Sequence, residues 1–471
     1  MSENSAIYDA RELGVPKMLI LGLQHMFAMF GATVLVPIIT GLDVATTLLC
    51  AGLGTLLFHV LTKMKVPAFL GSSFAFLGGY AAIAPKLADG SSNKELLPYA
   101  CLGVACAGMV YFVLAALIRF VGVNKVMRYF PPVVTGPIII AIGLCLAGSA
   151  INNCTTDWLV ALVALAVVII FNIWGKGMMK IIPIILGIVA SYIVALFRGG
   201  VDFTPIKEAD WFGVPLHADQ SILAIDWSNK SLILSAIIVI TPIALATMME
   251  HIGDISAISA TTGINYIKDP GLHRTLIGDG LATSLAALVG GPANTTYGEN
   301  TGVLVLTKVY DPRVVRLAAI FATVLSFSPK FAAIIETIPT ATIGGISFIL
   351  YGMISAAGVR NIVDSQVDFT NNRNLIIAAI ILVTSLGLTA GASFTIGSVT
   401  ITLSGLAVAS IAGIILNAIL PGKDFEFSED EPIDTGASLS SSTNVMDVVK
   451  SKRAKARSAA KKAEDKKEVK A

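Results

Sequence analysis

Charged residues are scarce in this chain of 471 residues: they make up 14% of it, whereas hydrophobic residues make up 55%. Soluble domains carry about 25% charged residues. This shortage of charge excludes an ordinary soluble enzyme and a disordered protein. The formal net charge is only +2. We therefore expect no nucleic-acid partner, because nucleic-acid binding needs a strongly basic surface.

Cysteines are few as well, and their number, five, is odd. No two of them have the spacing of metal ligands, so we expect them to be small packing residues in membrane helices and to hold no metal. We also expect no cofactor. Residues 1–17 lack the basic start and the small-residue cleavage site of a signal peptide. We therefore expect the first apolar helix to direct the chain to the membrane.

Long runs without charge are present instead, for example 18–42, 129–156 and 375–422. A spanning helix needs about 20 mainly apolar residues. The pattern predicts an all-α polytopic membrane protein with fourteen transmembrane segments. We place them near 18–40, 44–62, 66–84, 98–118, 132–151, 157–175, 181–197, 231–252, 275–290, 293–307, 314–328, 339–357, 375–391 and 399–420.

The distribution of Lys and Arg fits this number of spans. When the loops are assigned alternately to the two sides, those on the side of the termini hold most of the Lys and Arg residues before the tail. Cytoplasmic loops carry such an excess. The sequence therefore predicts a multi-pass protein of a bacterial inner membrane with both termini in the cytoplasm. The tail, 421–471, is acidic and then basic, and we expect it to be disordered, with a basic end able to touch lipid.

The second half of the chain repeats features of the first. A proline-rich start precedes an apolar span twice, with Pro131 corresponding to Pro339 and Gly136 to Gly344. The segments 66–84 and 293–307 are both interrupted by glycine, proline and small polar residues. Seven spans per half is an odd number, so the halves must cross the membrane in opposite directions. This is the inverted repeat of secondary transporters.

The two broken segments are the best pointer to a transport site, because non-helical backbone at membrane depth must line a cavity or be buried in protein. Ionisable residues inside spans are also costly. Glu250, Asp254 and Glu299 are the outstanding ones, and no Lys or Arg lies deep in a span to pair with them. We expect them to form the site, with Asp254 one turn after Glu250. His25 is a candidate for bracing the site, and Asp279, between two glycines, is expected at a helix start.

Carboxyl groups without metal-type clustering suit a ligand that offers N–H donors. A protonated carboxyl group donates to a carbonyl and accepts from the neighbouring N–H. A neutral nucleobase edge has this arrangement of donor and acceptor. A membrane enzyme is disfavoured because Glu250 with His251 is the only suggestive pair inside a span.

Several motifs resemble the nucleobase–ascorbate transporter family. Its signature, Gln/Glu-Asn-x-Gly-x4-Thr-Arg/Lys, matches Glu299-Asn300-Thr301-Gly302 followed by Thr307-Lys308. The stretches 24–37, 71–76, 250–253 and 291–299 also resemble family segments, so the likeness covers about 15–420. Glu at position 299 resembles the uracil permease branch, whereas xanthine and urate members usually have Gln there.

The resemblance implies an architecture of two inverted seven-span repeats with short strands in segments 3 and 10. It implies a cytoplasmic N-terminus (1–14), a core domain (15–130 and 231–330), a gate domain (131–230, with an outside loop, and 331–420) and the tail (421–471). Family members commonly form homodimers through the gate domain. Their core moves like an elevator.

The resemblance also implies residue roles. By position, Glu250 and Glu299 bind uracil with their carboxyl groups, Phe74 and Gly298 offer backbone N–H groups, and Tyr297 borders the pocket. Protons, coupled through Glu250, Asp254 and Glu299, drive uptake. Supporting positions are His25, Ser73, Asn300, Gly302 and Thr307.

One position departs from the uracil branch, in which histidine often follows the first Glu by one turn. Here it is Asp254, as in purine-transporting relatives. Histidine titrates near neutral pH and aspartate does not, so the proton relay does not carry over unchanged. A proton-coupled uracil importer remains the first expectation. A xanthine, urate or broader nucleobase permease is the alternative, and an anion exchanger or channel on the same fold is a remote one.

Overall fold

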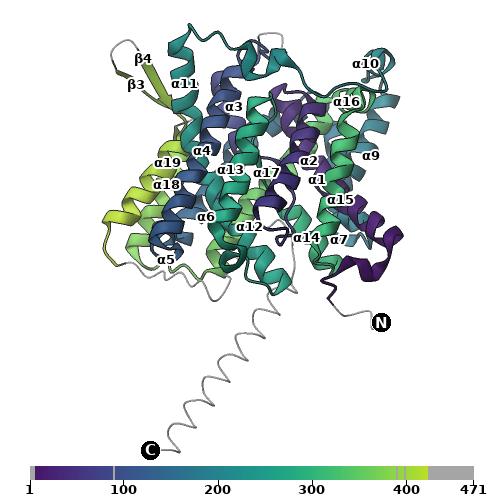
Figure 1. Cartoon of the computed structure of the whole chain (residues 1–471). Coiled ribbons are helices and arrows are strands. Elements are labelled where there is room, and N and C mark those ends of the chain that lie inside the picture. The colour runs from purple at the N-terminus through teal and green to yellow at the C-terminus, as the bar shows by residue number, and fades with distance from the viewer. Residues whose placement is uncertain (1–5, 88–90, 389–390, 397–398, 423–471) are drawn as a thin grey trace, which may run out of the picture.

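Most of this protein consists of apolar helices that lie side by side (Figure 1). Its structure is a computed structural model that describes residues 6–87, 91–388, 391–396 and 399–422. The first part contains η1 (Ala10–Leu13), α1 (Val15–Thr40), α2 (Val44–Leu61), β1 (Leu70–Ser72), η2 (Phe74–Phe76), α3 (Leu77–Ile83), α4 (Leu97–Val121), α5 (Val123–Met127), α6 (Pro132–Cys154), α7 (Trp158–Trp174), α8 (Met178–Ile181) and α9 (Pro183–Phe197). A connecting segment contains α10 (Thr204–Glu208), η3 (Ala218–Gln220) and η4 (Ile222–Ala224).

The second part repeats the order of long helices around a short strand. It contains α11 (Lys230–Ile240), η5 (Thr241–Ile243), α12 (Ala244–Thr262), η6 (Ile267–Gly271), α13 (Leu272–Leu288), β2 (Asn294–Thr296), α14 (Gly298–Thr307), α15 (Pro312–Ser326), α16 (Pro329–Glu336), α17 (Thr340–Asp364), α18 (Asn372–Gly387), β3 (Ala392–Ile396), β4 (Val399–Leu403) and α19 (Gly405–Ile419).

Within the described residues, six helices are long and apolar enough to cross a membrane, or seven if α15 and α16, which meet at 89°, form one broken span. Shorter apolar helices, including α7, α9, α18 and α19, lie among them. This number comes from length and composition alone. The expected total of fourteen spans therefore stays a prediction.

Helix packing is mirrored between the two parts of the chain. Helix α2 packs against α15 while α4 packs against α13, and α6 packs against α18 while α17 packs against α7. The most extensive contact joins α6 and α17, the two helices with proline-rich starts. At the contact of α4 with α13, a Cβ on Gly108 would lie 2.6 Å from the carbonyl oxygen of Gly280. Two glycines therefore permit this close approach.

Three local expectations need correction. The span expected at 231–252 extends from 230 to 262 and contains the 3₁₀ turn η5, where Pro242 has no N–H to continue the helix. The segment expected as a helix from 399 begins as strand β4, which pairs with β3 in a hairpin. Asp279 lies in the middle of α13 and does not start a helix.

Candidate functional site

Two short strands meet where the interrupted segments were expected to form a site. Strand β1 pairs antiparallel with β2, and Gly71 lies opposite Thr295. The pairing continues at both ends, because Ser73 N donates to Ala293 O (2.9 Å) and Tyr297 N donates to Phe69 O (3.0 Å). Each strand leads directly into a helix, β1 into η2 and α3, and β2 into α14. Two helix starts, with their free N–H groups and positive dipole ends, therefore lie close to the crossing.

Threonines on neighbouring helices satisfy the outer edges of the strands. Thr55 Oγ1 on α2 accepts from Leu70 N (2.9 Å) and lies 3.2 Å from Leu70 O. Thr283 Oγ1 on α13 donates to Asn294 O (2.7 Å). The amide of Asn294 in turn donates to Cys50 O (3.1 Å). These bonds satisfy backbone and side-chain groups of the strands that are buried inside the protein.

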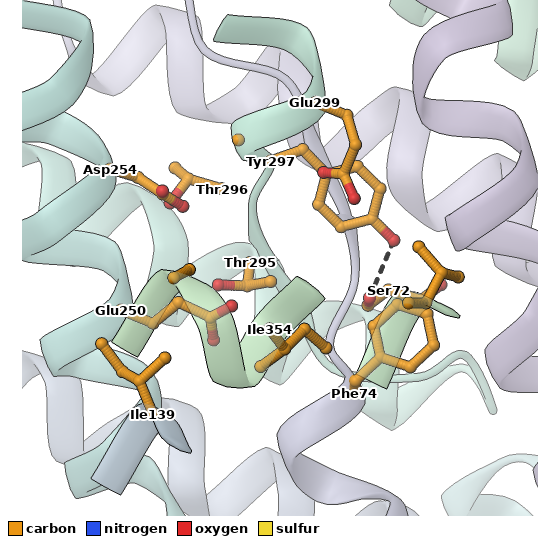
Figure 2. A pocket seen from close by; sticks show the side chains of 13 residues that line it. Ser72, Phe74, Ile139, Glu250, Asp254, Thr295, Thr296, Tyr297, Glu299 and Ile354 are labelled. Atoms are coloured by element: carbon orange, nitrogen blue, oxygen red, sulfur yellow. Dashed lines mark hydrogen bonds between the residues drawn. The ribbon is translucent and has the colours of Figure 1, made fainter. Parts of the chain in front are cut away.

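The crossing is also joined to α1 and across the two strands. Ser72 Oγ donates to Thr33 O (3.0 Å), and Tyr297 Oη donates to Ser72 O (2.8 Å; the dashed line in Figure 2). A Cβ on Gly71 would lie 2.4 Å from the Tyr297 ring. Glycine at position 71 therefore leaves the space that the Tyr297 ring occupies.

A pocket opens beside this crossing (Figure 2). Part of the lining comes from the strands, the helix starts and α12, and the rest comes from α6 and α17. The lining residues are Ser72, Phe74, Ile139, Glu250, Asp254, Thr295, Thr296, Tyr297, Gly298, Glu299, Leu350, Ile354 and Ala357.

Three carboxyl groups line the pocket. Glu250 and Asp254 belong to α12, and Glu299 is the second residue of α14; Figure 2 shows Glu299 on the side of the pocket away from Asp254. Among the described residues that line this pocket, none is Lys or Arg. The site thus presents acceptors, or donors once protonated, together with helix N–H groups, to a ligand that enters it.

Asp254 is connected to a second buried acid. Thr296 Oγ1 donates to Asp254 Oδ2 (3.0 Å), and the same hydroxyl lies 3.4 Å from His251 Nδ1. His251 Nδ1 also lies 3.4 Å from Asp279 Oδ2, and both of these side chains are completely buried. The Thr296 hydroxyl therefore connects Asp254, through His251, with Asp279 on α13.

The expected binding residues and the expected supporting residues occupy different places. Glu250, Glu299, Phe74, Gly298 and Tyr297 line the pocket, as does Asp254. The supporting residues lie behind this lining.

His25 on α1 accepts the amide of Asn300 at its backbone oxygen (3.0 Å), and the ring Nδ1 lies 3.2 Å from the same amide. Ser73 contributes the strand hydrogen bond of its backbone N–H. Gly302 lies farther along α14, and Thr307 Oγ1 donates to Val303 O (2.8 Å) near the end of that helix.

The sequence did not predict the apolar residues that α6 and α17 contribute to the pocket. Ile139 of α6 and Leu350, Ile354 and Ala357 of α17 line the same pocket as the carboxyl groups. In sequence they look like any residue of an apolar span. The proline-rich starts of both helices marked α6 and α17 as a related pair, and that was the available signal.

The chain belongs to the permease family, whose model matches residues 16–394; this is the family of nucleobase–ascorbate transporters. It is therefore a permease and a multi-pass membrane protein, not an enzyme.

Curated relatives cover nearly the whole chain. A uracil permease of Bacillus subtilis (strain 168) is 40% identical over 435 residues, which are 89% of this chain and 97% of that protein. A uracil permease of Bacillus caldolyticus is 43% identical over 412 residues, 86% of this chain and 92% of the relative. A uracil permease of Escherichia coli (strain K12) is 37% identical over 411 residues, with coverage of 85% and 90%.

Solved structures share the fold at low sequence identity. The transmembrane domain of the cyanobacterial bicarbonate transporter BicA matches with a TM-score of 0.57 at 15% identity, covering 88% of this chain and 99% of that domain. The structure of SLC26A9 matches with a TM-score of 0.61 at 12% identity, covering 88% of this chain and 66% of that one. These likenesses show the fold alone.

Proposed function

We propose that this permease imports uracil together with protons. The observation that carries the proposal is the placement of Glu250 and Glu299 around one pocket beside two helix starts, with no Lys or Arg among the described lining residues. Uracil is neutral and offers both N–H donors and carbonyl acceptors, so it fits such a site. The relatives named uracil permease support the same substrate.

In the proposed binding mode, the imide edge of uracil lies against the Glu250 carboxyl group. The second ring N–H donates to Glu299. The backbone N–H groups of Phe74 and Gly298, at the starts of η2 and α14, donate to the carbonyl groups. Tyr297 closes one side of the pocket, where the bond to Ser72 O holds its hydroxyl.

Proton coupling follows from the cost of moving charge. Carrying an ionised carboxylate through the low-dielectric interior costs several kcal/mol, about 2.5–3.5 on insertion scales. A proton on Glu250, or shared by Glu250 and Asp254, removes this charge when the base is bound. The loaded core then moves more readily than the empty charged one, so proton and base cross together. Asp254 takes part through its bond to Thr296.

We propose that the movement is elevator-like. The core would consist of α1–α5 and α11–α15 with strands β1 and β2, and the gate of α6–α9 and α17–α19. The fourteen spans would form two inverted repeats of seven, which the mirrored packing of α2 with α15 and α4 with α13 supports. The site lies where core strands face the gate helices α6 and α17, so sliding of the core would carry it across the membrane.

We further propose a bacterial inner-membrane location with both termini in the cytoplasm, lipid contact along the outer helices, and a homodimer formed through the gate domain. Large apolar side chains on α7 and α18, such as Leu162 and Val383, are more than half exposed in the single chain. Lipid or a second copy of the chain would cover them.

Two other substrates deserve direct comparison. Asp254 favours a purine, because purine-transporting relatives resemble this chain at that position. An anion is the third candidate because BicA and SLC26A9 share the fold. Anion sites place cations or bare helix ends at the ligand. This pocket also has two helix starts, but its three carboxyl groups would repel an anion when ionised.

Binding to the purified protein distinguishes these candidates. We expect isothermal titration to give a uracil affinity at least tenfold higher than that for xanthine, and no heat with bicarbonate. A higher affinity for xanthine than for uracil would favour a purine as the substrate. Binding of bicarbonate alone would contradict a nucleobase site.

A further inference from the structure

The segment before the first long helix pairs with the chain that follows α14. Ile7 N donates to Lys308 O (2.9 Å), and Tyr310 N donates to Ile7 O (2.8 Å). These two bonds form a parallel bridge between Ile7 and Val309. Ala10, Val309 and Val314 are buried together just beside it. Backbone and apolar contacts therefore fix Ile7–Leu13 to the junction of α14 with α15.

The same segment also contacts the end of α12. Tyr8 Oη donates to Thr262 O (2.7 Å), one of the last carbonyl groups of that helix. The last carbonyl groups of a helix have no intrahelical partner, so this bond satisfies one of them. The Tyr8 ring meets the Tyr310 ring edge to face, with centroids 5.5 Å apart. One residue thus touches α12 and the α14–α15 junction at once.

A charge network completes the attachment. Ala10 N donates to Asp311 Oδ2 (2.7 Å), and Arg313 Nη1 donates to Asp311 and to Asp9, at 2.9 Å in each case. The hydrogen bond from the Arg11 side chain holds the pKa of the Asp9 carboxyl well below its usual range. Asp9 therefore stays ionised, and its bond with Arg313 persists at cytoplasmic pH.

These attachment points lie at the far ends of the two helices that carry the pocket carboxyl groups. Thr262 is about 12 Å along α12 from Asp254, and Lys308 is about 13 Å from Glu299, at about 1.5 Å of rise per residue. Helix α14 is short and begins at the pocket. Its position relative to α12 is therefore set at one end by the strand crossing and at the other end by Ile7–Leu13.

We propose that Ile7–Leu13 acts as a clamp that sets the spacing of α12 and α14, and through them the separation of Glu250 and Glu299. Tyr8 and Asp9 are positioning residues: they reach the substrate only through these helices. The inference rests on the proposed function for its transport readout. It goes beyond that function in assigning a task to a segment outside the pocket.

The test uses two variants of the full-length protein, each with a matched control. Tyr8→Phe removes the bond to Thr262 and keeps the ring. Its control, Tyr192→Phe, removes a comparable hydroxyl bond to Thr337 Oγ1 (2.8 Å) from a helix of the proposed gate. Asp9→Asn weakens the bond to Arg313, and its control, Glu12→Gln, removes an exposed charge of the same segment.

We expect Tyr8→Phe and Asp9→Asn to raise the KM for uracil at least threefold, with kcat and membrane abundance within twofold of wild type. Both controls should keep the wild-type KM. An unchanged KM in both clamp variants would overturn the proposal. So would a loss of abundance without a change of KM, because that marks a merely structural contact.

A second readout does not depend on the substrate. Hydrogen–deuterium exchange of the purified protein should be faster in peptides from α14 in Tyr8→Phe than in Tyr192→Phe. Equal exchange in α14 would overturn the clamp. If wild type takes up no uracil at all, the proposed function fails, and this exchange measurement still decides whether the clamp exists.

Discussion

Glu250 and Glu299 stand in different local settings although they line one pocket. Glu250 lies inside α12, one turn from Asp254, which Thr296 binds. Glu299 lies in the first turn of α14, where the helix dipole favours negative charge. We therefore assign the transported proton to the α12 pair, and to Glu299 chiefly the contact with the base.

This assignment predicts that Glu250→Gln retains uracil binding within tenfold and loses concentrative uptake. Glutamine keeps the size and one hydrogen-bonding edge of a protonated glutamic acid, but it cannot release a proton. Equilibrium accumulation of labelled uracil measures the effect, with the exposed Glu95→Gln as the control. A wild-type accumulation ratio in Glu250→Gln would contradict the assignment.

Phe74 is proposed to act through its backbone N–H. Its preceding residue, Ser73, has ψ 126°, which is the conformation that a following proline requires, and the first position of a helix tolerates proline. Phe74→Pro therefore removes the N–H with little change of backbone. Phe74→Ala removes the same ring contact with Tyr351 and keeps the N–H.

We expect Phe74→Pro to weaken uracil binding about fivefold more than Phe74→Ala, since a hydrogen bond contributes about 1 kcal/mol. Titration of both purified variants measures the difference. Equal affinities would rule out the backbone donor.

Charged and special residues of the site could be predicted from sequence, and apolar ones could not. Glu250, Asp254 and Glu299 stood out because ionisable groups are rare and costly in spans. Ile139 and Ile354 did not, since burial against a ligand and exposure to lipid select the same side chains. Asp279 was misplaced because its flanking glycines suggested a helix boundary, whereas they allow close packing of α13.

At the scale of elements, the strand pair depends on threonines supplied by neighbouring helices. We expect the hydroxyl groups of Thr55 and Thr283 to contribute to stability, because each forms a hydrogen bond with a buried backbone group of a strand. Leaving a buried polar group unsatisfied costs about 1–3 kcal/mol.

We therefore predict that Thr55→Val and Thr283→Val each lower the thermal stability of the purified protein and reduce uracil affinity. Thr323→Val is the control, because the Thr323 hydroxyl bonds only Ala319 O in its own helix. Fluorescence-detected melting compares the three variants. Equal melting temperatures would show that the strand edges do not need these hydroxyls.

Gly71 offers a second test of the crossing. An added methyl group would lie 2.4 Å from the Tyr297 ring and 2.7 Å from Thr33 Oγ1. Overpacking of this kind costs about 1–3 kcal/mol. We expect Gly71→Ala to displace Tyr297 and reduce uptake at least tenfold.

Gly78→Ala is the matched control, because nothing lies within 4 Å of the position that its Cβ would take. In a helix alanine is more favourable than glycine. Uptake by Gly71→Ala at the level of Gly78→Ala would contradict the importance of the close contact.

Element positions followed from the sequence better than element details. The long apolar runs gave the extents of helices such as α2 and α6, because membrane thickness imposes their length. The turn η5 and the β3–β4 hairpin were missed. Both lie in segments without charge, so a search for charge-free runs does not mark the change of backbone conformation. Pro242 in η5 and the alternation of Ser or Thr with apolar residues in β3 and β4 were the available signals.

At the scale of the whole molecule, the mirrored helix pairs and the pairing of β1 with β2 connect the two parts of the chain. The strands tie the two halves of the proposed core together, and α6 with α17 provides a facing wall. The internal repeats in the sequence pointed to this relation. The contact of Ile7–Leu13 with the residues that follow α14 could not be predicted, because the sequence of this short segment does not indicate what it packs against.

Uptake of labelled uracil, in bacterial cells that lack their own uracil permease, is the most direct measurement of proton-driven import. We predict concentrative uptake that collapses when a protonophore is added and that excess xanthine does not compete with. Absence of uptake above the vector control, with the protein verified in the membrane, would contradict uracil as the substrate. Accumulation that persists with the protonophore would contradict proton coupling.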